Sequence, residues 1–308
     1  MRWNLGVAAL AGSWGFIWII ADHLHLGALS IVFWRIALSV LALGLGVLFS
    51  GRKELLRIGK PGRWTLLLGP GLALVWFCNF EAMKLSSVAV AVLATYTAPV
   101  FLALLAPIFL PERFSRVAWL ALPIASGGLA LTMLGGDGSK HFRPLAIAVG
   151  VSGAIVLAFL IIIQKHIVRA VNPIGLSFWI DIFAVVALLP VLPFAGRVLP
   201  SPTEFGFLAI VGVVFTALSG LIWLLLLRHV TAQAMGSLSY LEPVSAALLA
   251  WLILGQRMGL AIFAGGALVL VAGALVVFGE PTETAVGEVA GLPQPREQSA
   301  EALSAAVE

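Results

Sequence analysis

Two stretches in opposite halves of the chain contain its only two tyrosines, each followed three residues later by a proline. A proline has no backbone N–H, so a helix that contains one leaves the carbonyl group four residues earlier without its donor. For Pro99 and Pro243, those carbonyls belong to Thr95 and Ser239, which also carry hydroxyl groups. We therefore predict at each stretch either a helix kink alone or a kink that also contacts a substrate.

The tyrosines themselves, Tyr96 and Tyr240, lie well inside apolar runs. Tyrosines that anchor a helix at a membrane surface are found near the ends of such runs instead. Each ring could stack on a substrate, and each hydroxyl could donate a hydrogen bond. We predict that both side chains line a cavity.

Glu242 has no acidic counterpart, because Ala98 stands at the matching position of the first stretch. A charge at mid-membrane costs at least ~2.5–3.5 kcal/mol, so this side chain requires protein or water around it. It could bind a substrate amine or cation, cycle a proton, or form a structural hydrogen bond to a neighbouring helix. On an unbroken helix it lies about 200° from Tyr240. Both side chains could then share one cavity only if the proline rotates the helix.

Arg35 and Asp181 are charged residues within apolar runs, at nearly equivalent positions of the two halves. They could pair with each other, Arg35 could bind a substrate carboxylate or snorkel, and Asp181 could reach interfacial water. Asn79, near the end of another apolar run, completes the polar candidates for substrate binding.

Three tryptophans join this candidate set: Trp14, Trp76 and Trp179. For Trp14 and Trp76, packing between helices is one reading, and an aromatic wall of the substrate cavity is the other. Trp14 is flanked by glycines, which allow helices to approach closely. The spacing of His23 and His25 is a weak pattern for metal binding, and Cys78 is the only cysteine. We predict neither a metal site nor a cofactor.

The elements that position these residues follow from composition. Of 308 residues, 61% are hydrophobic and 10% are charged, against roughly 25% charged in soluble domains. Apolar runs of about 20 residues can cross a ~30 Å hydrocarbon core as helices. We predict an all-α integral membrane protein with ten transmembrane helices at residues 5–22, 28–49, 64–83, 87–109, 116–134, 144–163, 174–195, 205–227, 231–254 and 259–278.

The distribution of Lys and Arg predicts the orientation of these helices. With the N-terminus in the cytoplasm, the cytoplasmic loops hold about twice as many basic residues as the loops on the other side. Ten helices also return the C-terminus to the cytoplasm. The tail, residues 280–308, is rich in Pro, Glu, Gly and Ser, which predicts disorder.

The two tyrosine stretches belong to a longer internal duplication. Ala103-Leu104-Leu105-Ala106 matches Ala247-Leu248-Leu249-Ala250, and Phe33-Trp34 matches Phe178-Trp179. Five helices per half is an odd number, so the halves must insert with opposite orientations. We predict two inverted five-helix repeats, residues 1–139 and 140–279, with a binding site between them.

These motifs resemble the drug/metabolite transporter superfamily, EamA branch. The first repeat carries the resemblance in Lys84-Leu85-Ser86-Ser87, Tyr96-Thr97-Ala98-Pro99-Val100 and Leu110-Pro111-Glu112-Arg113. The second carries it in Arg228-His229-Val230-Thr231-Ala232-Gln233-Ala234, Ser239-Tyr240-Leu241-Glu242-Pro243-Val244 and Leu254-Gly255-Gln256-Arg257. The sequence departs from the pattern at Gln256, where such repeats usually carry Glu. The resemblance implies a transporter of amino acids, sugars, nucleotide precursors or drugs.

We therefore predict a secondary transporter, not an enzyme, that exports small metabolites across a bacterial inner membrane by alternating access. A cavity with tyrosines, tryptophans, hydroxyls, one cation and one or two acids suits a zwitterion, so amino acids are the leading substrate class. A proton is a possible coupling ion. The alternatives are the other substrates of the superfamily or, from a different class, a membrane-embedded lipid-modifying enzyme, whose His or Asp-rich motifs the sequence lacks. No nucleic-acid partner is predicted, since the basic residues are scattered among loops.

Overall fold

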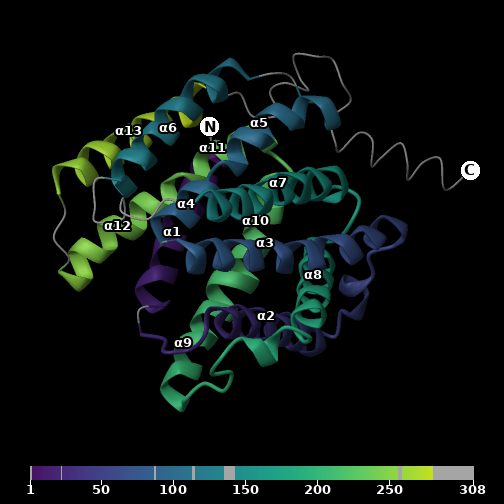
Figure 1. The fold of residues 1–308 in the computed structure, drawn as a ribbon. Coiled ribbons are helices and arrows are strands. Elements are labelled where there is room, and N and C mark those ends of the chain that lie inside the picture. Colours follow the sequence, from purple (N-terminus) through teal and green to yellow (C-terminus); the bar gives the residue numbers. More distant parts are fainter. Residues whose placement is uncertain are drawn as a thin grey trace, which may run out of the picture.

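The structure is a computed structural model that describes residues 2–21, 23–86, 88–112, 115–134, 143–255 and 259–279. Within these residues the chain forms helices joined by short loops (Figure 1). The predicted disorder of residues 280–308 lies outside the described residues.

The first half contains six α-helices and two short 3-10 helices among its described residues. In chain order they are α1 (Arg2–Ala21), α2 (Ala28–Ser50), η1 (Lys53–Leu56), η2 (Lys60–Trp64), α3 (Thr65–Leu85), α4 (Val88–Thr95), α5 (Ala98–Phe109) and α6 (Arg116–Leu134).

The second half repeats this order with some differences. Its elements are α7 (Pro144–Ile167), α8 (Pro173–Leu188), η4 (Leu192–Phe194), α9 (Pro202–Gly212), the π-helical segment η5 (Val213–Leu218), α10 (Ser219–Leu227), α11 (Ala232–Ser239), α12 (Leu241–Leu254) and α13 (Leu260–Gly279).

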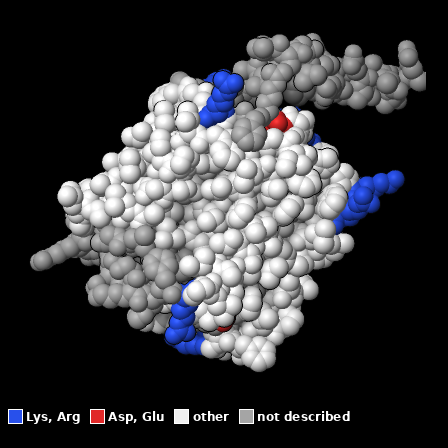
Figure 2. Space-filling view, turned by 45° about the horizontal axis from the view of Figure 1, so that its top comes forward, with Lys and Arg blue, Asp and Glu red and all other residues white. Residues whose placement is uncertain are grey.

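The described helices form ten consecutive crossings of the bundle, here called passages, each made of one helix or of several helices in a row. This confirms the predicted fold class. Three passages are composite: α4 with α5, α9 with η5 and α10, and α11 with α12. Five of the ten are long and apolar enough to cross a bilayer, and three further helices are apolar but shorter. α1 and α3, with 20 and 21 residues, are each about 30 Å long at 1.5 Å per residue. Figure 2 shows a broad face almost without charge, with Lys and Arg at its borders.

One predicted boundary is wrong. The seventh predicted helix extends to residue 195, whereas α8 ends at Leu188. Pro190 and Pro193 follow shortly afterwards, and a proline has no backbone N–H to donate to the carbonyl four residues earlier, so the helical hydrogen bonds end there. The chain continues instead as the short helix η4.

The packing of helices follows the predicted duplication. The paired helices α6 and α13 are equivalents of each other, as are α2 and α8 (Figure 1). Other contacts occur twice: α3 against α7 corresponds to α1 against α10, and α3 against α8 corresponds to α2 against α9. α1 against α12 corresponds to α7 against α5, and α1 against α11 corresponds to α7 against α4. This exchange of partners is what two inverted repeats produce.

Gly15 allows α1 to pack closely on α12. A Cβ atom at this position would overlap the Ser245 hydroxyl and lie 2.6 Å from the Ala246 amide nitrogen. We expect Gly15→Ala to destabilise the protein by roughly 1–3 kcal/mol, because overpacking forces the two helices apart. Equilibrium unfolding in mixed micelles measures this loss.

Gly12 on the same helix is the matched control for that substitution. A Cβ atom there meets no heavy atom within 4 Å, so we expect the unfolding midpoint of Gly12→Ala to stay unchanged or to rise slightly, because alanine favours helix over glycine. Equal effects of the two substitutions would contradict the close approach at Gly15.

Candidate functional site

The two tyrosine stretches meet where the two halves of the chain face each other. The first composite passage is interrupted at Tyr96 and Thr97, between α4 and α5, and the second at Tyr240, between α11 and α12. The tyrosine rings lie 5.6 Å apart, centroid to centroid. Gly236 of α11 packs against Pro99, where an added Cβ would lie 3.3 Å from the Pro99 Cα. The interruptions therefore bring the same motif from both halves into contact.

Tyr240 is buried, with 1% of its surface exposed. Its hydroxyl donates to the backbone carbonyl of Tyr96 at 2.6 Å. Because that uses its one proton, the Ser126 hydroxyl, 2.9 Å away, donates to the Tyr240 oxygen. The sequence predicted freed carbonyls at Thr95 and Ser239, and the carbonyl held by the other half is that of the next residue, Tyr96.

This arrangement predicts a stability effect for Tyr240→Phe. The substitution leaves the Tyr96 carbonyl without its donor, and an unsatisfied buried group costs about 1–3 kcal/mol. Unfolding in mixed micelles measures the loss. A Tyr240→Phe variant as stable as the wild type would contradict the structural role of this hydrogen bond.

Glu242 also reaches Tyr96, from the first turn of α12. The Tyr96 hydroxyl and the Glu242 carboxylate are hydrogen-bonded partners, so Tyr96 is held at its hydroxyl by one side chain and at its carbonyl by another. Glu242 also interacts electrostatically with Arg35. Both Glu242 and Tyr96 are partly exposed, whereas Tyr240 is not. The acid and the buried tyrosine thus contact opposite ends of one residue.

Arg35 of α2 is the positive centre of this region. Its cation interacts electrostatically with the carboxylates of Glu242 and Asp181, and its Nε donates to the Thr216 hydroxyl at 3.2 Å. The guanidinium carbon lies 5.0 Å from the centre of the Trp76 ring, within the range of a cation–π contact. Side chains from four other helical segments therefore converge on one arginine.

Asp181 of α8 is buried and accepts a hydrogen bond from Ser39 of α2 at 2.6 Å. Its interaction with Arg35 joins α2 and α8, the helices that are equivalent in the two repeats. We call Arg35, Asp181, Glu242, Tyr96, Trp76 and Thr216 the central cluster.

The other predicted residues lie in different surroundings. Trp14 packs against Trp223, with ring centroids 5.6 Å apart, and the Ser239 hydroxyl donates to the Met235 carbonyl one turn earlier. Thr95 and Asn79 are partly exposed. Trp179 is a residue of α8 but lies outside the central cluster. Its indole nitrogen donates to the Leu56 carbonyl at 2.9 Å, and its side chain lines a groove beside η2.

The structure also brings together residues that the sequence did not predict as functional. Thr216 lies in a π-helical segment, a feature often found at functional sites, and its hydroxyl donates to Val211 five residues earlier. Such a segment has no pattern in the sequence. At one end of the bundle, both Glu112 oxygens accept the Ala232 amide N–H, at 2.9 and 3.0 Å. The resemblance to known transporters, which carry Glu at this position, was the available signal for Glu112.

The buried partner of Glu112 is Lys165 of α7. Its Nζ lies 3.9 Å from the carboxylate and donates to the carbonyls of Leu227 and Val230 at 2.7 and 2.6 Å. Glu112 thus caps the first turn of α11 across the two halves, and Lys165 neutralises it.

Known proteins resemble this chain over most of its length. The sequence pattern of the EamA-like transporter family matches residues 1–134 and 144–278. The chain is 27% identical to the Uncharacterized transporter YxxF of Bacillus subtilis (strain 168), over 83% of this chain and 86% of that protein. It is 30% identical to an Uncharacterized transporter of Archaeoglobus fulgidus, over 72% of this chain and 79% of that protein.

A solved crystal structure shares the fold. It superposes with a TM-score of 0.77 at 18% sequence identity, over 89% of this chain and 94% of the other. The fold of ten helical passages is therefore that of an experimentally known protein.

Proposed function

Because this chain belongs to the EamA-like transporter family and is a multi-pass membrane protein, we propose that it exports small zwitterionic metabolites, amino acids foremost. Transport is secondary and follows alternating access, with the substrate bound at the central cluster between the two repeats. The observation that carries this proposal is Arg35 with two carboxylates, those of Asp181 and Glu242, beside it.

A zwitterion can enter such a cluster without leaving a charge unpaired. Arg35 interacts electrostatically with two protein carboxylates, those of Glu242 and Asp181. A substrate carboxylate can take the place of Glu242 at the guanidinium, in the bidentate geometry that arginine favours. The released Glu242 then pairs with the substrate amine. Each charge keeps a partner throughout this exchange, which avoids the cost of an isolated charge in the membrane.

The neighbouring aromatic side chains support binding of the substrate's apolar part. Tyr96 and Trp76 border Glu242 and Arg35 directly, and Trp14 pairs with Trp223 on the neighbouring helices α1 and α10. Aromatic rings provide large apolar contact with few rotatable bonds. We assign Tyr96, Arg35 and Glu242 to substrate binding and Tyr240 to holding Tyr96 in place.

We further propose that both termini are cytoplasmic and that the protein resides in a bacterial inner membrane. The segment from Gly51 to Trp64 carries five basic residues and one acid, and basic loops remain in the cytoplasm. A cysteine-accessibility assay on inside-out and right-side-out vesicles tests this orientation.

Substrate class is tested with purified protein in liposomes. Labelled L-alanine, L-phenylalanine, L-lysine, glucose and ethidium represent neutral, aromatic and cationic amino acids, a sugar and an aromatic cation. We expect efflux of at least one amino acid and none of glucose. If only ethidium or only glucose is transported, the substrate is a drug or a sugar and not an amino acid.

Coupling is tested with the Glu242→Gln variant in the same liposomes, with and without a pH gradient. If Glu242 carries the coupling proton, the gradient accelerates efflux by the wild type and has no effect on the variant. If the wild-type efflux rate is the same with and without the pH gradient, transport is not coupled to protons. If the Glu242→Gln variant also transports at the wild-type rate, Glu242 is not a substrate ligand.

A further inference from the structure

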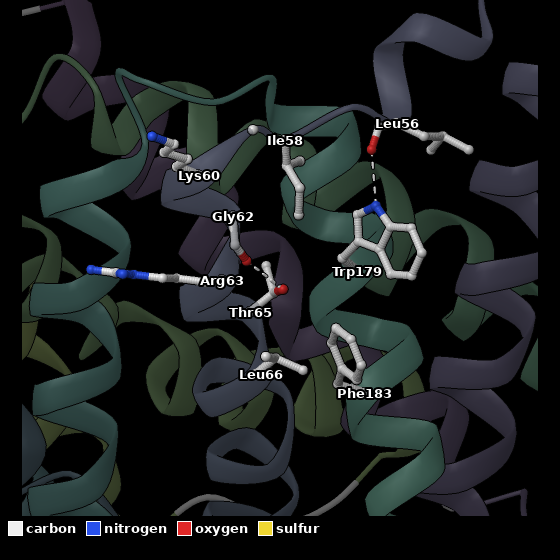
Figure 3. Close-up of a pocket in the computed structure, with 10 residues that line it drawn as sticks. Leu56, Ile58, Lys60, Gly62, Arg63, Thr65, Leu66, Trp179 and Phe183 are labelled. Atoms are coloured by element: carbon white, nitrogen blue, oxygen red, sulfur yellow. Dashed lines mark hydrogen bonds between the residues drawn. The ribbon is translucent and has the colours of Figure 1, made fainter.

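The groove beside η2 combines two chemistries on its opposite sides. It has a volume of about 590 Å³ and lies between η1, η2, the start of α3 and α8. Figure 3 shows Lys60 and Arg63 on one side, Trp179 and Phe183 on the other, and Gly62 and Thr65 between them. Asp181 lies about 200° around α8 from both Trp179 and Phe183, so this groove and the central cluster occupy opposite faces of that helix.

The polar side of the groove is accessible and positively charged. Lys60 and Arg63 are both exposed, and Arg63 extends past the Trp64 ring, 6.0 Å from its centre. Basic side chains at a helix end are attracted to the anionic headgroups of a membrane leaflet. These charges would attract a free anion equally well. The apolar side of the groove therefore determines whether the ligand is a free anion or a lipid.

The apolar side continues from the loop into the membrane-spanning part of the bundle. Trp179 is fixed by its hydrogen bond to Leu56 (Figure 3) and stacks on Phe183, with ring centroids 5.9 Å apart. Those four residues of helix cover about 6 Å along the axis. Leu66, also in the groove, has 56% of its surface exposed. A ligand that satisfies both sides needs a negative headgroup with an acyl chain attached.

We propose that this groove binds one anionic phospholipid, with its phosphate between Lys60 and Arg63 and its first acyl segment against Leu66 and Phe183. The site is distinct from the transport pathway proposed above, and neither proposal depends on the other. Trp179 belongs to this lipid site and forms the aromatic wall beside the glycerol region.

The test uses the full chain, purified and delipidated in a non-ionic detergent, and native mass spectrometry with added phosphatidylglycerol or phosphatidylcholine. We expect preferential binding of phosphatidylglycerol. The Lys60→Gln/Arg63→Gln variant is expected to lose roughly 10- to 30-fold in affinity, since each basic residue contributes about one factor of five.

Arg52→Gln/Lys53→Gln is the matched control, because it removes two charges from the same loop but from outside the groove. We expect it to keep the wild-type affinity. Thermal unfolding without lipid shows that both variants are folded, and the single substitutions Lys60→Gln and Arg63→Gln replace the double variant if it is not.

Three outcomes would overturn the proposal. Equal binding of phosphatidylglycerol and phosphatidylcholine would show that the groove does not recognise the headgroup charge. Equal losses of affinity in the two double variants would show that the lipid responds to the total positive charge of the loop and not to a specific site. Displacement of the lipid by millimolar inorganic phosphate would show that the groove recognises a phosphate and not a lipid.

Discussion

The Arg35→Gln variant is expected to transport amino acids about 30-fold more slowly than the wild type, because losing a charge-assisted hydrogen bond to the substrate carboxylate costs roughly 2 kcal/mol. Two carboxylates, those of Asp181 and Glu242, depend on this cation. Without it they repel each other, and the substrate carboxylate has no partner. Efflux from liposomes, with the amino acid that the wild type moves fastest, measures the effect.

Two further variants separate the charge of Arg35 from its geometry. Arg35→Lys keeps the charge but lacks the planar group that lies over Trp76 and donates to Thr216, so we expect an intermediate rate. Arg57→Gln removes an exposed charge from the same half, and we expect the wild-type rate. If Arg35→Gln transports as fast as Arg57→Gln, Arg35 is not a substrate ligand.

The second large effect concerns stability. Glu112→Ala is expected to destabilise the protein by about 3–5 kcal/mol, because it removes a counter-charge of the buried Lys165 ammonium. The Lys165 and Glu112 side chains are 6% and 3% exposed. The substitution also removes the acceptor of the Ala232 amide at the start of α11. Equilibrium unfolding in mixed micelles measures the difference.

A second ion pair of the chain provides the comparison. Arg197 and Glu204 are closer, at 3.0 Å, but the arginine side chain is 52% exposed. Exposed pairs contribute about 0–1 kcal/mol, so we expect little effect from Arg197→Ala despite the shorter distance. Equal losses in Glu112→Ala and Arg197→Ala would show that burial does not govern the Glu112 interaction.

The sequence predicted the helices well because composition and proline positions act locally. Ten apolar runs became ten passages, and the duplicated tyrosines marked the place where the halves meet. The identity of the shared carbonyl was beyond this reasoning. Val100 and Phe101 both donate to the Thr97 carbonyl, so the Val100 amide, four residues after Tyr96, is used at the start of α5. The Tyr96 carbonyl, not that of Thr95, receives the Tyr240 hydroxyl.

The positions of Tyr240 and Glu242 show where prediction from helix geometry fails. On a continuous helix their separation by about 200° predicted different surroundings for them. The structure interrupts the helix at Tyr240 itself, so the angle does not apply across that residue, and both reach Tyr96. Tertiary partners such as Thr216 and Lys165 were also unpredictable, because their contacts join positions far apart in the sequence.

The central cluster has a consequence for how the chain is made. Arg35 enters the membrane with α2, before the ribosome has synthesised either Asp181 or Glu242. Its counter-charges arrive only with α8 and α12. During that interval an arginine at mid-membrane costs ~2.5–3.5 kcal/mol, which the apolar residues of α2 must offset. Insertion of the first half therefore depends on the surplus hydrophobicity of that single helix, and polar substitutions in α2 will reduce the yield of inserted protein before they affect transport.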